Sequence, residues 1–133
     1  MSAFWDTNVF VYAFIVGPKQ QVARERLTAG GTISVQVLNE FASVMTKKMR
    51  QPWNDVERFL SVIRVRFPSA SPLTLETHAA AFALARDHSL AFYDALILAA
   101  ATEAGCGTLY SEDFQHGRRF GDLTIVNPFL SRA

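Results

Sequence analysis

The spacing of hydrophobic residues predicts short buried strands that alternate with helices. Strand-like apolar runs are short and lie between turn signals, at residues 1–5, 32–35, 70–73, 108–110 and 123–126. Elsewhere apolar residues recur every three or four positions, the period of one helix face, as in Val37, Phe41, Val44, Met45 and Met49. Glycine, proline and capping signals bound the predicted helices, which cover about residues 8–16, 18–27, 36–49, 54–67, 74–88 and 92–104.

This order of elements indicates an α/β sandwich with a mostly parallel central sheet. The chain has 133 residues, half of them hydrophobic, which is the usual scale of one domain with one core. We therefore expect a single domain over residues 1–133. In such sheets, ligand sites form where strands end at their carboxyl edge.

Charge and cysteine content narrow the function only slightly. The net charge is +1, so nucleic-acid binding would depend on local basic patches and a metal ion. The single cysteine, Cys106, has no partner for an internal disulfide, and the longest apolar run, residues 95–101, is too short to cross a bilayer. From the sequence we expect a soluble cytoplasmic protein.

Four acidic residues occupy positions where a parallel sheet would bring them together. Asp6 and Asp113 directly follow predicted strands, and Glu40 and Asp94 lie near the beginnings of predicted helices. Clustered carboxylates repel one another unless a cation or a shared proton neutralises them. Oxygen ligands without His or Cys favour Mg²⁺ or Mn²⁺, ions that orient phosphates and activate water. The sequence thus predicts a metal site for phosphate-ester chemistry.

Each of these residues also has a purely structural interpretation. Asp6 is suited to capping the helix that follows it, and Asp94 to stabilising the first turn of its own helix. Glu40 alone fits the solvated face of an amphipathic helix. Glu112 is expected to point away from its neighbour Asp113, because consecutive residues of an extended chain point in opposite directions. By the same rule Tyr93 is expected to face the core.

The motifs around these acids resemble those of PIN-domain ribonucleases, in particular the VapC toxins of bacterial toxin–antitoxin pairs. The motifs are Asp6-Thr7-Asn8, Val37-Leu38-Asn39-Glu40-Phe41, Tyr93-Asp94-Ala95-Leu96-Ile97 and Ser111-Glu112-Asp113-Phe114, in the family order along nearly the whole chain. The resemblance implies a three-layer α/β/α sandwich and an enzyme that cuts single-stranded RNA or RNA loops, leaving 5′-phosphates.

The resemblance also implies a role for each site residue. Asp6, Asp94 and Asp113 would be ligands of Mg²⁺ or Mn²⁺, directly or through water. Glu40 would hold a water molecule or accept its proton, and Asn8 and Ser111 would support the site by hydrogen bonds. The same family features imply a homodimer and a small VapB-like antitoxin that blocks the cleft.

Four basic residues are candidates for RNA contact. Lys47 and Lys48 lie two turns beyond Glu40 and are expected on about the same face of that helix. Arg118 and Arg119 follow Asp113 closely enough to flank the same cleft. Solvated charge at a helix end or in a loop explains them equally well.

Two other classes of protein remain as alternatives. An aspartyl phosphotransfer enzyme would use an Asp at the end of the first strand, but a dehalogenase-type phosphatase would carry a second Asp where this chain has Asn8. A non-catalytic PIN-like module that binds RNA or protein is the other alternative, and such modules usually lack some of the acids. The complete set of four acids in this chain favours the nuclease.

Overall fold

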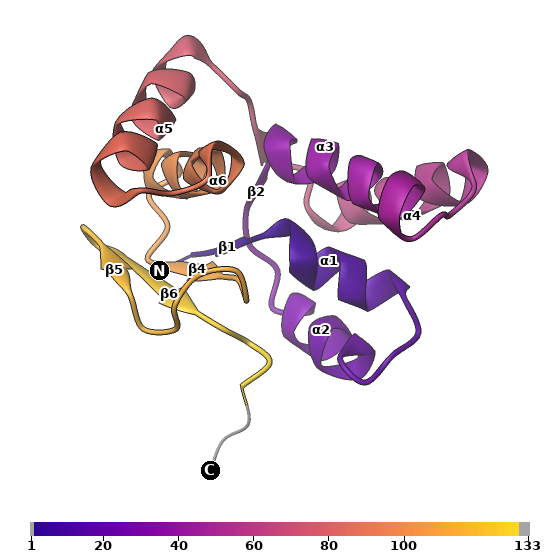
Figure 1. The fold of residues 1–133 in the computed structure, drawn as a ribbon. Coiled ribbons are helices and arrows are strands. Elements are labelled where there is room, and N and C mark those ends of the chain that lie inside the picture. The colour runs from indigo at the N-terminus through magenta and orange to yellow at the C-terminus, as the bar shows by residue number, and fades with distance from the viewer. Residues whose placement is uncertain (1, 131–133) are drawn as a thin grey trace.

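The computed structural model describes residues 2–130 and contains a four-stranded, mostly parallel sheet (Figure 1). Its order is β1-β4-β6-β5, formed by Ala3–Trp5, Thr108–Tyr110, Leu123–Val126 and Arg119–Phe120. The first three of these run parallel, and β5 pairs antiparallel with β6. A second parallel pair, β2 (Ile33–Ser34) with β3 (Ala70–Ser71), is linked to β1 by a bridge between Phe4 and Thr32.

Helices flank the sheet, as the sequence predicted. They are α1 (Thr7–Phe14), α2 (Gln20–Leu27), α3 (Val35–Ser43), α4 (Trp53–Arg66), α5 (Leu75–His88) and α6 (Phe92–Glu103). A π-helical segment, η1 (Val44–Lys48), continues α3. Figure 1 shows α5 next to α6, while α1 lies between α2 and α3. The α/β/α sandwich with a mostly parallel sheet is thereby confirmed.

The core is centred on the alternating buried residues of the sheet. Phe4, Leu109 and Ile125 lie side by side in register across β1, β4 and β6 and are fully buried. The apolar run 95–101 forms the middle of α6 and is also buried. Burying one such large apolar side chain stabilises the fold by about 1.5–3 kcal/mol. No helix within residues 2–130 has both the length and the hydrophobicity to span a membrane.

The end of β1 is held in place by a close contact with the chain that enters β2. The Trp5 indole N–H donates to the Gly30 carbonyl at 2.8 Å, and its ring stacks on Tyr110 with centroids 4.3 Å apart. Gly31 has φ +139°, and a Cβ there would lie 2.5 Å from the Ala3 carbonyl oxygen. Only glycine fits so close to β1 in this conformation. The packing fixes the direction in which the chain leaves β1, at Asp6.

Several elements differ from the sequence prediction, and two of these differences have a clear local cause. The strand predicted for residues 32–35 is shorter, because Ser34 caps α3 by accepting a hydrogen bond from the Val37 N–H and Val35 is already helical. The strand β5 was not predicted, since two residues with one exposed arginine carry no strand pattern.

Candidate active site

Asp6 lies at the junction of β1 and α1, with only 2% of its surface exposed. One carboxylate oxygen accepts the Thr7 N–H at 2.7 Å, which caps α1. The other accepts the Ser111 hydroxyl at 2.6 Å. Because β1 and β4 are parallel neighbours, the Asp6 N–H also donates to the Tyr110 carbonyl. Asp6 is therefore both a helix cap and a fixed point at the carboxyl edge of the sheet.

Ser111 and Asn8 connect Asp6 to Asp113. The buried Ser111 Oγ accepts the Asp113 N–H at 3.0 Å while donating to Asp6. The Asn8 amide donates to Asp113 Oδ2 at 3.0 Å and to Ser111 Oγ at 3.3 Å. These bonds orient two carboxylates that are 107 positions apart in the sequence.

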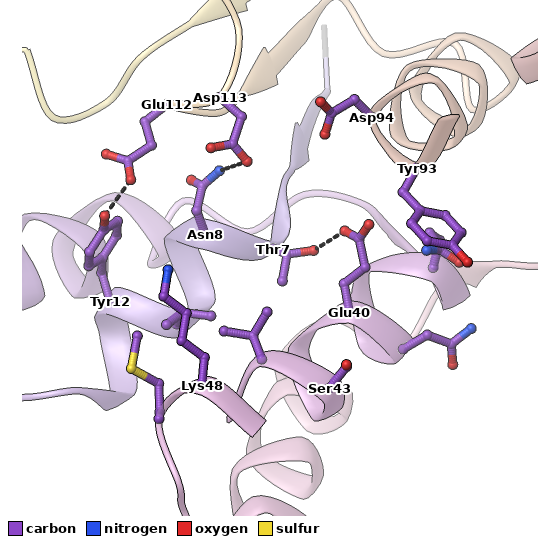
Figure 2. Close-up of a pocket in the computed structure, with 15 residues that line it drawn as sticks. Thr7, Asn8, Tyr12, Glu40, Ser43, Lys48, Tyr93, Asp94, Glu112 and Asp113 are labelled. Atoms are coloured by element: carbon purple, nitrogen blue, oxygen red, sulfur yellow. Dashed lines mark hydrogen bonds between the residues drawn. The ribbon is translucent and has the colours of Figure 1, made fainter. Parts of the chain in front are cut away.

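Glu40 reaches the same region from α3. The Thr7 hydroxyl donates to Glu40 Oε2 at 2.9 Å, so Thr7 binds Asp6 through its backbone N–H and Glu40 through its side chain. Asp94 comes from the first turn of α6. Thr7, Asn8, Glu40, Asp94 and Asp113 all line one open cavity of about 620 Å³. Figure 2 shows Asp113, Asp94 and Glu40 arranged around it. Asp6 does not line the cavity, but it is buried and hydrogen-bonded to Thr7, which does.

The carboxylates of the cavity disfavour one another's ionisation. Burial raises the pKa of Asp6 to about 7, although the bonds from Ser111 and Thr7 lower it, and the charges of Asp113 and Glu40 raise it further. Burial also raises the pKa of Glu40, where hydrogen bonds from Thr7 and Gln36 oppose the shift and the charges of Asp94 and Asp113 add to it. The pKa of Asp94 is raised by burial and by Asp113. Such a site attracts cations.

These side chains fit a divalent cation in the chemistry of their donor atoms, although they are not spaced as a ready-made metal site. Among residues 2–130, no three Asp, Glu, His or Cys side chains converge closely enough to form a ready-made metal site. The donors are nevertheless all oxygens, and the pKa values of Asp6, Glu40 and Asp94 are raised. Within the described residues, the buried Asn8 Oδ1 has no hydrogen-bond partner. This chemistry suits a hard cation such as Mg²⁺ or Mn²⁺.

A comparison with protein-family models matches residues 3–119 to the PIN domain. This chain belongs to the PIN domain family. No curated protein sequence matches it significantly.

Solved structures share the fold of this PIN domain. VapC20 of Mycobacterium tuberculosis, a sarcin–ricin loop cleaving toxin, is 20% identical with a TM-score of 0.71, and the match covers 84% of this chain and 90% of VapC20. A toxin–antitoxin complex from Klebsiella pneumoniae is 23% identical with a TM-score of 0.73, covering 96% and 98%. VapBC2 from Rickettsia felis, bound to a promoter DNA fragment, is 20% identical with a TM-score of 0.69, covering 94% and 97%.

The PIN domain has one acidic side chain at the cavity that the sequence placed outside it. Glu112 lines the cavity, accepts a short hydrogen bond from the Tyr12 hydroxyl and pairs with Lys19 Nζ at 2.7 Å. The alternation rule failed because residues 112–114 form a bend rather than a strand. The i,i+4 spacing of Asn8 and Tyr12 on α1 was the available signal.

The other predicted positions divide between the cavity and its surroundings. Tyr93 is 62% exposed and lines the cavity, because it is in the first turn of α6 rather than in extended chain. Lys48 lines the cavity, but Lys47 lies at a separate hollow. Arg118 packs its guanidinium over the Phe120 ring, and neither it nor the exposed Arg119 lines the cavity.

Proposed function

We propose that this PIN domain is a metal-dependent endoribonuclease, the toxin of a VapBC-type toxin–antitoxin pair. The main support is that segments distant in sequence bring Glu40, Asp94 and Asp113 to one cavity, with Asp6 bound to Thr7 of the cavity lining. The fold shared with VapC20 and with two toxin–antitoxin complexes, one of which is VapBC2, adds to this support.

In this proposal Asp6, Asp94 and Asp113 hold Mg²⁺ or Mn²⁺. Without the cation, Asp6 binds Thr7 and Ser111, and Asp113 binds Asn8. Ser111 and Asn8 keep Asp6 and Asp113 oriented, as supporting hydrogen bonds do at metal sites. A bound cation would supply an activated water molecule and offset the charge that develops on the phosphate.

The reaction is hydrolysis of an RNA phosphodiester. Water attacks phosphorus, the bond from phosphorus to the 3′ oxygen breaks, and the products carry a 5′-phosphate and a 3′-hydroxyl. Glu40 faces the cavity and is assigned to accept the proton of the attacking water. Its raised pKa brings it closer to the operating pH, which suits a general base. The Thr7 bond keeps one of its oxygens in a fixed direction.

The partners follow from the same assignment. We infer a VapB-like antitoxin that inhibits the nuclease, a homodimer, and action on RNA in the cytoplasm. The structures from K. pneumoniae and R. felis are toxin–antitoxin assemblies, which supports the antitoxin. We also propose that residues 1–133 form one PIN domain; Met1 and residues 131–133 lie outside the part of the chain that the structure describes.

The test is cleavage of defined RNAs by the purified chain. Labelled RNAs that include structured loops and a sarcin–ricin hairpin are incubated with Mg²⁺, with Mn²⁺ or with chelator. Asp94→Asn removes one carboxylate charge from the cavity, and Asp122→Asn makes the same change in an exposed turn. We expect metal-dependent cleavage by the wild type and the Asp122 variant, with a loss of at least about 100-fold in the Asp94 variant.

Calorimetric titration with Mn²⁺ gives a second readout that does not depend on finding the right RNA. The wild type should bind the ion, and Asp94→Asn should bind it about 10–100-fold more weakly. If a folded wild type binds no metal and cuts no RNA, the non-catalytic binding module becomes the better assignment. Cleavage that persists in chelator would refute the metal mechanism.

A further inference from the structure

Two adjacent lysines lie at the end of the helix that carries Glu40, and only one faces the cavity. In a regular α-helix each residue advances about 100°, so Lys47, seven positions after Glu40, would lie within about 20° of it. Lys48 would lie about 80° away. A continuous α-helix would therefore place Lys47, rather than Lys48, on the Glu40 face.

The structure has the opposite arrangement because the helix changes type. In η1 (Val44–Lys48) the Met49 N–H donates to the Val44 carbonyl at 3.0 Å, five residues back, which is the π-helical pattern. A π turn is wider than an α turn and advances by a smaller angle per residue, so it rotates the following side chains backward around the axis. Lys48 moves toward the Glu40 face, and Lys47 moves off it. Such turns occur frequently at functional sites.

The two lysines line different hollows, as this rotation requires. Lys48 lines the cavity that Glu40, Asp94 and Asp113 also line. Lys47 instead borders a separate hollow together with Ala42, Ser43, Thr46 and Trp53. Figure 2 shows the Lys48 side chain extending from η1 toward the part of the cavity where Tyr12 and Asn8 lie.

The ammonium group of Lys48 makes no ion pair with any carboxylate of residues 2–130. Glu112, the acidic side chain on the Tyr12 side of the cavity, is paired with Lys19. Lys48 thus supplies a positive charge, open to a ligand, to the cavity that three carboxylates also line. A polyanion that approaches those carboxylates needs such a charge, and a lysine binds phosphate as a point charge without requiring one orientation.

We propose that the π turn places Lys48 to bind a backbone phosphate of single-stranded RNA adjacent to the one that is cut, and that Lys47 takes no part. This inference rests on the proposed nuclease function and assigns the residue that holds the substrate across the site. Lys48 is a binding residue here, since it lies on the cavity wall and the reaction itself is assigned to the carboxylates.

The test compares Lys48→Ala with Lys47→Ala, a matched pair in which adjacent exposed lysines lose the same charge. Both are made in the Asp94→Asn background, so that a fluorescent single-stranded RNA is bound without being cut. One phosphate contact contributes about 0.7 to the slope of log affinity against log salt, which corresponds to about fivefold at 0.1 M salt. We expect Lys48→Ala to weaken binding about fivefold and to reduce the salt slope by about 0.7.

Lys47→Ala should change affinity less than about twofold, because its charge lies outside the cavity. With Asp94 intact, Lys48→Ala should raise KM more than it lowers kcat. If the two variants weaken RNA binding equally, or if Lys48→Ala has no effect on it, the inference is overturned. The nuclease proposal would still stand in that case, provided that the wild type cleaves RNA. Absence of both cleavage and RNA binding by the wild type would instead remove the nuclease proposal and this inference with it.

Discussion

Asp6 is expected to make the metal-free protein less stable as the pH rises. Its carboxylate is buried, and burial with the charges of Asp113 and Glu40 raises its pKa to about 7. Asp6→Asn keeps the size of the side chain and an oxygen for the Thr7 N–H, but it removes the charge. The substitution should therefore stabilise the protein at alkaline pH while it damages the proposed metal site.

The sign follows from proton binding. Between pH 4 and pH 7 the folded chain holds a proton on Asp6, whereas the unfolded chain, with a pKa near 3.8, does not. The free energy of unfolding therefore falls as the pH rises through this window, and the loss is complete above about pH 7. The whole difference amounts to about 4 kcal/mol, at about 1.36 kcal/mol for each tenfold change in proton affinity.

Part of this fall in the free energy of unfolding occurs below pH 5, where Asp6 is already largely ionised in the unfolded chain. Between pH 5 and pH 8 the Asp6 contribution should fall by about 2–3 kcal/mol. The raised pKa values of Glu40 and Asp94 act in the same direction and remain in the variant. The useful quantity is thus the difference between wild type and Asp6→Asn at each pH.

Urea unfolding in chelator at several pH values measures this difference, because the buried Trp5 reports loss of the core. Asp122→Asn, in an exposed turn, is the control for a change in net charge. If wild type and Asp6→Asn change in parallel between pH 5 and pH 8, the argument from burial is refuted. Mn²⁺ at 100 times its Kd should restore about 2.7 kcal/mol to the wild type at pH 8.

Two further predictions concern packing and the charge network beside the site. Gly31→Ala should destabilise the protein by about 1–3 kcal/mol in urea unfolding, because the added Cβ would meet the Ala3 carbonyl oxygen. Gly17 has open space around it, so the control Gly17→Ala should leave the stability nearly unchanged. The pKa of Tyr12 is raised mainly by its hydrogen bond to the Glu112 carboxylate, so Glu112→Gln should lower it. Tyrosinate absorbance, followed as the pH is raised, measures this pKa, and an unchanged titration would contradict the assigned cause.

Much of the fold could be predicted because its elements have regular patterns. A helix at 92–104 was predicted to end before Gly105 and Gly107, and α6 is Phe92–Glu103. The strand predicted at 123–126 is β6. The order of the strands in the sheet carried no such signal, because the pairing of β1 with β4 depends on packing between residues that are more than 100 positions apart. Hydrophobic periodicity is a local property.

The positions of the site residues could be predicted where the order of parallel strands determines them. They were predicted less well where a local bend or helix type determines which way a side chain points. Asp6 and Asp113 follow parallel neighbouring strands, so the rule for carboxyl edges placed them together. Glu112 was misplaced because the chain bends after β4 instead of continuing as a strand. Lys47 and Lys48 were predicted to lie on about the same face as Glu40, but only Lys48 lines the cavity. The π turn that separates them has no signal in their residue types.

The two interpretations of Asp6, helix cap and metal ligand, are compatible in this geometry. The cap uses one carboxylate oxygen and Ser111 uses the other, so both helix α1 and strand β4 fix the side chain's direction. A carboxylate held this way has little freedom to turn toward water, which is why burial dominates its pKa. The same two contacts that stabilise the ends of α1 and β4 therefore leave a charge that only a proton or a cation can balance. A capping role thus prepares Asp6 for the proposed metal site.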